Sequence, residues 1–487
     1  MMQLIDNSST KCDRIASNGT PFASANAESS RVIIVSHSYA PMLNPRALRW
    51  TAIAEHLAEA GKRVDVVCSW SPDMHESACN HSVNIHRVGA GLIERLRAIL
   101  RTKERTSLVS SATGNNTQRD RSVLHAEKNT LKTLTRRFHD LTWKNVYWPD
   151  YAALWAKPAI ERVNSLLADD DTNVTLITVS DPFTSHVVGR SVKRAHPDLN
   201  WIVDIGDPFC FRHDTPTNNH TLYRAYNYRC ERKVFNEADS ISVTTGATMR
   251  RYAELFPAAA EKITVIPPLV TFAHVDTQSA PLEAPLGESD AFKALFTGAL
   301  YRNIRNPEYL LQLFAALQEA TPDVARELHF FGPTDDCKNI FDSFNATLQR
   351  HSGLSVHLHG LMSHSTTIAG LQQADLLVNI GNANPYQLPS KVVEYACTTK
   401  PILNISCIKQ DSSTEFFAGR PNTLTLNATD SVALGEHAKM LQKFLQSDSE
   451  PVLESYCEDI RARHSSEIIS KEYQRLIRQQ KKKVAGR

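Results

Sequence analysis

Short apolar runs alternate with longer amphipathic stretches between residues 31 and 270. The first run, Val32-Ile33-Ile34-Val35, is the continuous β-branched pattern that is typical of a strand buried on both faces. The stretch from Pro45 to about Ala60 carries apolar residues at helical spacing and ends at Gly61. A second apolar run follows, and this order of strand, helix and strand predicts an α/β unit with a parallel sheet. Its further predicted elements are strands at 64–68, 176–179, 201–204, 240–243 and 263–266 and helices at 222–238 and 248–256.

A second alternating set follows a segment rich in Pro, Ala, Ser and Glu, which we interpret as a linker at 271–290. Its clearest helix start is Asn306-Pro307-Glu308, which offers an N-cap, a proline in the first turn and a first-turn acid. The pattern predicts two Rossmann-like, doubly wound α/β domains that face each other across a cleft. The expected parts are a disordered tail at 1–30, a first domain at 31–270, a second domain at 291–464 and a helix at about 465–480 that packs back on the first domain. The predicted elements of the second set are strands at 295–296, 328–331, 356–359, 376–379, 401–404 and 423–426 and helices at 307–320, from 389 onward, and at 466–480.

The composition excludes several functional classes. The 487 residues carry a net charge of only +2, so neither half is basic enough to follow a nucleic-acid backbone. Nine scattered cysteines form no Cys-x-x-Cys pair, which argues against a disulfide framework and a zinc site and favours a reducing cytosol. No apolar run approaches the length of a membrane span, and the polar N-terminus has no signal-peptide core. The expected location is therefore cytoplasmic, either free or peripheral on the inner face of the membrane.

One segment is strongly basic. Residues 91–144 hold 12 Lys/Arg against 5 Asp/Glu, and apolar residues recur at helical spacing between 92 and 100. A basic amphipathic helix near Trp143, Trp148 and Trp155 suits the face of an anionic membrane. A solvated helix that packs its leucines on the domain core fits the same pattern. Both interpretations stay open.

The candidate chemistry gathers in the second domain, in loops after predicted strands. Gly298 begins a loop that contains Arg302 and Arg305, Gly360 follows another strand, and a Gly/Asn-rich loop leads through Tyr386 to Pro389. Glycine lets a backbone approach a ligand closely, and arginine can donate two parallel hydrogen bonds to a phosphate. Together the loops outline a site for a phosphorylated ligand. The first domain lacks a G-x-G-x-x-G fingerprint, so a nicotinamide cofactor is not supported.

The helix predicted to start at or next to Pro389 is the centre of this site. Ser390 is available to cap it, and Lys391 and Glu394 lie three residues apart on one face. A lysine and a helix N-terminus suit a phosphate, while the carboxylate can accept hydrogen bonds from hydroxyls. A surface ion pair on an ordinary amphipathic helix is the alternative.

The order of these pieces resembles the retaining, nucleotide-sugar-dependent glycosyltransferases of the GT-B fold, of the "group one" (family four) type. The bacterial exopolysaccharide, capsule and O-antigen proteins look like the most similar branch. The resemblance covers residues 31 to about 480, and no one motif carries it alone. Its carriers are the segments 35–41 with Arg46 and Trp50, 203–208, 231–239, 296–298, 305–307, 359–360, 374–375, and 389–391 with Glu394.

The resemblance implies roles for the residues of the second domain. Arg302, Arg305 and Lys391 are expected to hold the donor diphosphate as the catalytic cations, and Glu394 the ribose. Gly298, Gly360, Ser390 and Tyr386 are expected to line the donor site, with Gly360 against the base. The sequence departs from the family at two positions. Tyr386 stands where an acid for the donor sugar is expected, and Ala299 stands where the first cation of the Arg-x5-Lys pair is expected.

In the first domain the resemblance implies acceptor contacts from Arg46 and Asp207 and, with less support, His37 and His186. It also implies a reaction without a bound metal, a cofactor or a protein nucleophile. The expected partners are a nucleotide-sugar donor and a glycan or lipid-linked acceptor. Two other functions fit the same fold: a nucleotide-sugar epimerase that needs no acceptor, and a degenerate homologue that serves as a scaffold, made plausible by Tyr386 and Ala299.

Overall fold

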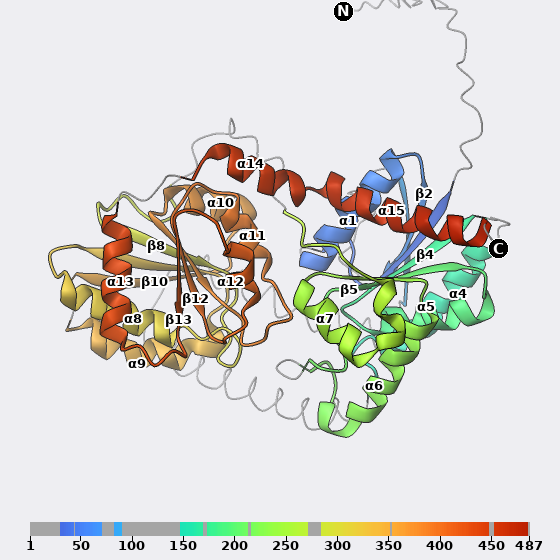
Figure 1. Cartoon of the computed structure of the whole chain (residues 1–487), viewed down its shortest axis with the longest axis horizontal. Helices are drawn as coiled ribbons and strands as arrows, with labels where there is room; N and C mark the ends of the chain where they lie inside the picture. Colours follow the sequence, from blue (N-terminus) through green and yellow to red (C-terminus); the bar gives the residue numbers. More distant parts are fainter. Residues whose placement is uncertain are drawn as a thin grey trace, which may run out of the picture.

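The computed structural model describes residues 30–42, 44–70, 82–89, 147–168, 173–212, 216–270, 284–350, 353–447 and 452–485. It contains two parallel sheets, one in each of two α/β domains that lie side by side (Figure 1). The predicted fold class of two doubly wound domains is therefore confirmed. The predicted tail at 1–30, apart from Ser30, falls outside the described residues, as do the basic segment 91–144 and most of the predicted linker.

The N-terminal domain is built on seven strands in the order β3-β2-β1-β4-β5-β6-β7, all parallel. Every residue of β1 is buried, as its continuous apolar run predicts. The sequence analysis missed β3 because its middle, Asn84-Ile85-His86-Arg87, is polar and only half-buried. The strands are β1 (Arg31–Ser36), β2 (Arg63–Ser69), β3 (Val83–Val88), β4 (Val174–Val179), β5 (Asn200–Ile205), β6 (Ser240–Val243) and β7 (Ile263–Val265).

Helices cover both faces of this sheet. One apolar core joins the sheet to α4, α5, α6 and α7, and a second joins its other face to α1 and α15. Asn44 caps α1 by accepting a hydrogen bond from the backbone N–H of Ala47, and Gly61 follows the helix with φ +79°. The helices are α1 (Pro45–Glu59), α4 (Ala156–Leu167), α5 (Thr184–Ala195), α6 (His220–Glu237) and α7 (Gly246–Leu255).

The C-terminal domain repeats the arrangement with six parallel strands in the order β10-β9-β8-β11-β12-β13. Helices α8, α9 and α13 pack on one face, and α10, α11 and α12 on the other. The strands are β8 (Phe292–Thr297), β9 (Arg326–Phe331), β10 (Leu354–Gly360), β11 (Leu376–Ile380), β12 (Ile402–Ser406) and β13 (Thr423–Asn427). The helices are α8 (Glu308–Ala320), α9 (Lys338–Leu348), α10 (His364–Gln373), α11 (Ser390–Ala396), α12 (Ser412–Phe417) and α13 (Leu434–Gln446).

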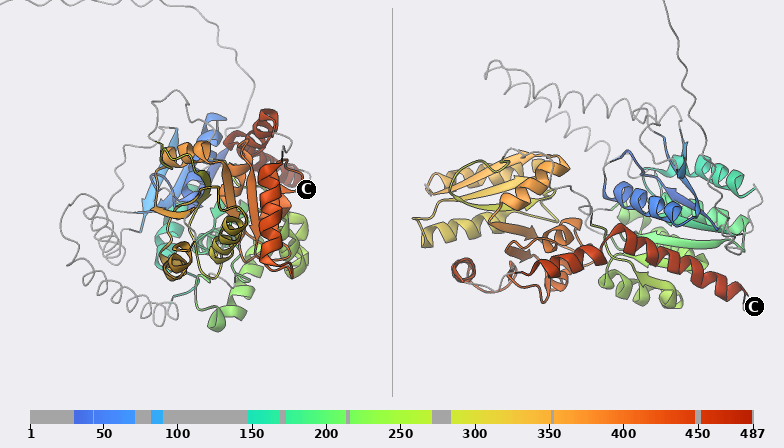
Figure 2. Two further views of the ribbon diagram at one scale, coloured as in Figure 1. Left: turned by 90° about the vertical axis from the view of Figure 1, so that its left-hand side faces the viewer. Right: turned by 90° about the horizontal axis from the view of Figure 1, so that it is seen from above.

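The chain then returns to the first domain. Helix α14 (Glu454–Arg463) leads into α15 (Ser466–Ala485), which lies along the N-terminal domain beside α1 (Figures 1 and 2). Tyr473 of α15 is fully buried, and its hydroxyl donates to Asp204 Oδ1 over 2.7 Å. Trp50 of α1 donates to the other oxygen of the same carboxylate over 2.9 Å. A buried carboxylate on β5 thus ties the last helix of the chain to the first domain. No helix in the described part of the chain is both long enough and apolar enough to cross a bilayer.

One predicted helix start is wrong by one residue, and one predicted helix cap is wrong. Helix α8 begins at Glu308 with Pro307 as its N-cap, although the Asn306 side chain still accepts the Glu308 N–H over 2.8 Å. Helix α11 begins at Ser390 with Pro389 as its N-cap, and no side chain caps it. Ser390 therefore cannot act as the cap, because it is already the first helical residue.

Candidate active site between the two domains

A pocket of about 440 Å³ opens between the domains, where loops at the carboxyl ends of both sets of strands meet. Such strand ends are where open α/β sheets bind ligands. The residues that line the pocket from the N-terminal domain are Ser38, Asn44, Pro45, Arg46, Arg49, Tyr151, Asp181, Gly206, Asp207, Thr244, Pro268 and Leu269. Those from the C-terminal domain are Arg305, Asn382, Gln387, Leu388, Pro389 and Ser390. We call this the interdomain pocket.

Arg305 is the cation that the C-terminal domain presents to this pocket. Its Nε and Nη2 donate to Asn382 Oδ1 over 3.2 and 2.8 Å, and its Nη1 donates to the Ala299 carbonyl over 3.1 Å. A guanidinium has five N–H groups, so two have no partner within the described part of the chain. Burial lowers the pKa of Arg305 from its usual value of 12.5, but arginine remains charged at pH 7. Three hydrogen bonds thus fix the Arg305 side chain, and its two remaining N–H groups can donate to a ligand.

The backbone beside Arg305 is free of side chains. Gly298, Gly332 and Gly360 follow three neighbouring strands, with φ of +136°, +132° and +73°. The Gly298 N–H donates to the Phe331 carbonyl and the Gly332 N–H to the Gly360 carbonyl, over 2.8 and 2.7 Å. A Cβ on Gly332 would lie 2.2 Å from the Gly298 carbonyl oxygen, so only glycine fits there. Gly332 is thus packed against the Gly298 backbone, whereas a Cβ on Gly360 would meet no atom within 4 Å. None of the three glycines lines the interdomain pocket. The sequence analysis named Gly298 and Gly360 but missed Gly332.

Helix α11 carries the predicted pair. Lys391 Nζ lies 2.6 Å from Glu394 Oε2, and the two side chains are 29% and 5% exposed. An ion pair on an ordinary surface helix would leave its carboxylate in water, whereas the Glu394 carboxylate is buried. Neither Lys391 nor Glu394 is among the residues that line the interdomain pocket. Ser390 lines the interdomain pocket at the start of the same helix.

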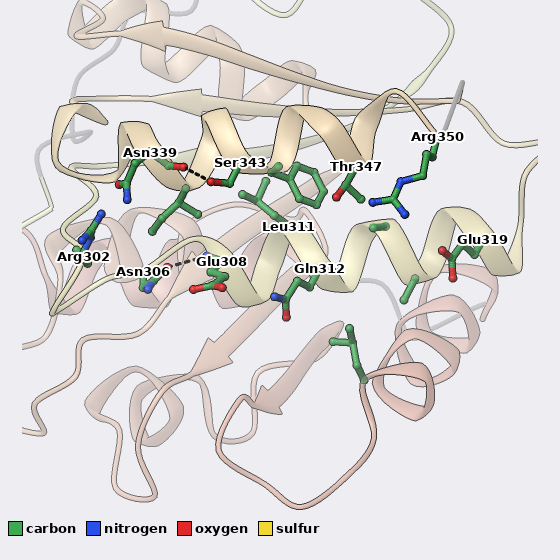
Figure 3. A pocket seen from close by; sticks show the side chains of 15 residues that line it. Arg302, Asn306, Glu308, Leu311, Gln312, Glu319, Asn339, Ser343, Thr347 and Arg350 are labelled. Carbon is green, nitrogen blue, oxygen red and sulfur yellow. Dashed lines mark hydrogen bonds between the residues drawn. The ribbon is translucent and has the colours of Figure 1, made fainter.

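Arg302 lies elsewhere. Its backbone N–H donates to Asp336 Oδ2 over 3.0 Å, and its side chain lines a separate groove between α8 and α9. Figure 3 shows it at one end of that groove beside Asn306, with Arg350 at the other end. The structure therefore separates Arg302 from Arg305 and does not bring it to the interdomain pocket.

Tyr386 and Gln387 join the domains. The Tyr386 carbonyl accepts a hydrogen bond from Thr248 Oγ1 over 2.7 Å, and its ring meets the edge of Phe211 at 4.8 Å. Gln387 Nε2 donates to Asp207 Oδ1 over 2.7 Å. Tyr386, which stands where the family resemblance expects an acid, thus contacts the N-terminal domain and does not line the pocket.

The N-terminal domain presents paired charges. Arg212 Nη1 lies 3.2 Å from Asp181 Oδ2 and 3.5 Å from Asp207 Oδ2. The pKa of Asp181 is raised, chiefly by burial and further by Asp207, while Arg212 and Arg46 oppose the shift. The sequence analysis named Asp207 but missed Asp181 and Arg212. Asp181 stood in a loop after a predicted strand, but its pairing with Arg212 spans 31 residues and has no local signal.

Arg46 lies flat against Gly206. A Cβ on Gly206 would fall 1.3 Å from Arg46 Nη2, so the glycine makes room for the guanidinium. Arg46 lines the interdomain pocket and makes no hydrogen bond within the described part of the chain. It is therefore available to a ligand from the N-terminal side.

The two predicted histidines do not line the pocket. His37 packs edge-on against Tyr151 and Trp155, with ring centroids at 5.5 and 5.1 Å. His186 is fully buried, and its Nδ1 lies 2.8 Å from Thr178 Oγ1. Burial lowers the pKa of His186 to about 3, so the ring is neutral at pH 7. Its surroundings are those of a core histidine.

Glu231 is hydrogen-bonded to the backbone of the loop that carries Asp207. This fully buried carboxylate accepts hydrogen bonds from the backbone N–H groups of Phe209 and Cys210 over 3.3 and 2.9 Å and from the Tyr252 hydroxyl over 2.6 Å. Burial raises its pKa. Glu231 therefore fixes the loop that carries Asp207 without reaching the pocket itself.

Comparison with known proteins begins with this domain. The family model described as Glycosyl transferase 4-like domain matches residues 47–268. The N-terminal domain is thus similar to glycosyltransferase domains. No curated protein matches the chain.

Solved structures match over both domains. Sucrose-phosphate synthase from Thermosynechococcus elongatus is 13% identical, with a TM-score of 0.60 over 92% of this chain and 98% of that chain. WaaG, a glycosyltransferase involved in lipopolysaccharide biosynthesis, is 13% identical, with a TM-score of 0.51 over 92% and 99%. The Anabaena protein HepE, solved in complex with UDP, is 11% identical, with a TM-score of 0.54 over 92% and 100%. These likenesses give the chain the GT-B fold. With the family match, they indicate a transferase enzyme of the glycosyltransferase type.

Proposed function

We propose that the protein transfers a sugar from a nucleoside-diphosphate sugar to a glycan or lipid-linked acceptor, with retention of configuration, in cytoplasmic polysaccharide or glycolipid biosynthesis. The proposal rests on the position of Arg305. Hydrogen bonds to Asn382 and Ala299 hold it at the interdomain pocket, and two of its N–H groups have no partner among the described residues. A fixed, partly unsatisfied guanidinium is suited to a diphosphate.

The donor side is the C-terminal domain. The backbone at Gly298 and Gly360 suits close approach of the flat base and ribose, and Glu394 suits the ribose hydroxyls. Lys391 and Arg305 carry the positive charge that the diphosphate needs. The complex of the structurally similar HepE with UDP supports a uridine nucleotide as the first donor to try.

The acceptor side is the N-terminal domain. Arg46 offers free N–H groups, and the carboxylates of Asp181 and Asp207 can accept hydrogen bonds from sugar hydroxyls. The printed role of WaaG in lipopolysaccharide biosynthesis supports a glycan or lipid-linked acceptor on this side.

The reaction breaks the bond between the anomeric carbon and the donor phosphate oxygen and forms a bond from that carbon to an acceptor hydroxyl oxygen. The acceptor proton passes to the departing phosphate oxygen, so nucleoside diphosphate and glycoside are the products. Negative charge grows on the diphosphate as the bond breaks, and Arg305 and Lys391 stabilise it more strongly there than in the ground state. This route needs no protein nucleophile.

The test is to incubate the full-length protein with UDP- and GDP-sugars and membrane or oligosaccharide acceptors. Nucleoside diphosphate release that depends on the acceptor, with retained configuration in the product by NMR, supports the proposal. Sugar isomerisation without diphosphate release would instead identify an epimerase. A nucleotide present at 100 times its Kd should also stabilise the protein by about 2.7 kcal/mol. If no nucleotide raises the melting temperature, only a scaffold role remains.

A further inference from the structure

Four ionisable side chains lie close together on the two strands at an edge of the C-terminal sheet. His329 of β9 and His357 of β10 are direct partners in the strand register. Glu327 precedes His329 by two residues and so points to the same face of β9. That is the face covered elsewhere by α10 and α11. His359 stands at a bulge in the register of β10, and its Nε2 lies 3.0 Å from His329 Nδ1. None of the four lines the interdomain pocket.

The spacing of their polar atoms is that of metal ligands. One ligand atom from each of Glu327, His329 and His357 lies within 4.8 Å of the others. His329 Nε2 and Glu327 Oε2 are already 3.1 Å apart. Two ligands at the usual bond lengths of a tetrahedral zinc ion are about 3.3 Å apart, so these two atoms need almost no movement. His357 is exposed, so its ring can rotate to complete the set.

Neighbouring groups orient the two buried ligands. Ser289 Oγ donates to Glu327 Oε1 over 2.9 Å, which leaves Oε2 for the ion. His329 Nδ1 lies 3.0 Å from His359 Nε2. If Nε2 of His329 binds a metal, Nδ1 carries the ring proton and donates it to His359. Outer hydrogen bonds of this kind are typical of metal sites.

The N-terminal domain has a carboxylate on the corresponding strand, where an arginine and a histidine are its partners. There Asp65 on β2 is hydrogen-bonded by Arg31 of β1 and His86 of β3, both over 2.8 Å. β1, β2 and β3 hold the places in their sheet that β8, β9 and β10 hold in theirs. The cation available on β8 is Lys293, but its amine donates to the Ser289 carbonyl. Among the described residues, the Glu327 carboxylate therefore has no arginine or lysine in an ion pair.

We propose that Glu327, His329 and His357 bind a divalent transition-metal ion of the zinc class, with water as the fourth ligand and His359 as an outer partner. The ion joins β10 to β9 at the exposed edge of the sheet. None of its ligands lines the interdomain pocket, so the ion is independent of the proposed sugar transfer. Sequence analysis did not predict this site because the four residues are split between two strands and no Cys-x-x-Cys pair accompanies them.

The experiment is calorimetric titration of Zn²⁺ into full-length protein made without a histidine tag and stripped by a chelator. We expect one ion per chain with a micromolar or tighter Kd. His357→Ala should abolish this binding or weaken it more than tenfold, and His359→Ala should weaken it by about 10–100-fold. His196→Ala, which removes an exposed histidine of the N-terminal domain, is the matched control and should bind as the wild type does.

Two further measurements make the outcome decisive. Co²⁺ in place of Zn²⁺ should give a tetrahedral visible spectrum without a thiolate charge-transfer band, because the nine cysteines take no part. The metal-free His357→Ala protein should melt at the wild-type temperature, since the side chain is exposed. Absence of saturable Zn²⁺ binding to the wild type overturns the proposal, and so does unchanged binding to folded His357→Ala protein.

Discussion

The two domains share one architecture, yet the carboxyl edges of their sheets differ in chemistry. The C-terminal edge has three glycines with positive φ and a fixed arginine, Arg305. The N-terminal edge carries charged side chains, with Asp181 and Asp207 paired to Arg212 and with Arg46 lining the same pocket. Bare backbone with cations suits a flat, anionic nucleotide, whereas mixed charges suit the many hydroxyls of a sugar. The difference assigns the donor to one domain and the acceptor to the other under the proposed function.

The largest expected effect comes from removing the donor-side cation. Arg305→Met should lower kcat/KM by about 10²–10³-fold, the loss typical of removing one donor that stabilises developing negative charge. Steady-state kinetics with the preferred donor measures it. The matched control is Arg302→Met, three residues away, because that side chain lines the α8–α9 groove (Figure 3). An equal fall in kcat/KM in both variants would contradict the assignment of Arg305, but not Arg302, to the donor site.

Glu394 tests whether the buried ion pair belongs to the donor site. Glu394→Gln keeps the shape of a side chain that is 5% exposed but removes its charge. A hydrogen bond to a charged group contributes about 1.5–3 kcal/mol and misplacement of the donor costs more, so turnover should fall by about 10². The thermal midpoint of the metal-free, nucleotide-free variant is the control for folding. Wild-type turnover in the folded variant would remove Glu394 from the site.

The next prediction concerns the pH dependence of stability at Asp65, on strand β2 of the N-terminal sheet. Burial alone would raise the pKa of Asp65, but hydrogen bonds from His86 and Arg31 outweigh it and hold that pKa at about 2, against 3.8 for an ordinary aspartate. The group therefore stabilises the fold fully above about pH 4, and the contribution of about 2 kcal/mol disappears as the pH falls toward 2. Urea denaturation of the wild type and Asp65→Asn across this range checks it. If the two proteins lose stability in parallel as the pH falls, the assignment is wrong.

The smallest effect concerns the contact between the domains. Gln387→Ala removes the hydrogen bond to Asp207 and should cost about 1 kcal/mol. Because Asp207 stands on the acceptor side, the change should raise the acceptor KM more than the donor KM. Separate titrations of the two substrates distinguish these outcomes, and a change confined to the donor KM would contradict the division between the edges.

The repeating α/β architecture could be predicted from the sequence because each strand and helix has its own local pattern of apolar residues. The run Val32-Ile33-Ile34-Val35 became a fully buried strand, and the three-residue spacing of Lys391 and Glu394 became a 2.6 Å ion pair. Pairings distant in sequence left no such signal. The hydrogen bond of Tyr473 to Asp204 and the ion pair of Arg212 with Asp181 depend on how the chain folds back on itself.

The loop of Arg302 and Arg305 shows a second limit. Both arginines looked equivalent in the sequence, but the Arg305 N–H donates to the Tyr301 carbonyl over 2.8 Å and closes a tight loop. That loop turns one guanidinium toward the interdomain pocket and leaves the other at the α8–α9 groove. Ser390 failed as a predicted cap for a similar reason, since one residue of shift in the helix start changes a cap into a first-turn residue.

The measurement that tests the division between the two edges most directly is calorimetric titration of UDP and GDP, without acceptor, into the wild type, Arg305→Met and Arg46→Met. The account predicts that Arg305→Met weakens binding of the preferred nucleotide by about tenfold or more, because a charged hydrogen-bond donor is lost, while Arg46→Met binds it as the wild type does. Weakened binding in Arg46→Met together with unchanged binding in Arg305→Met would contradict it.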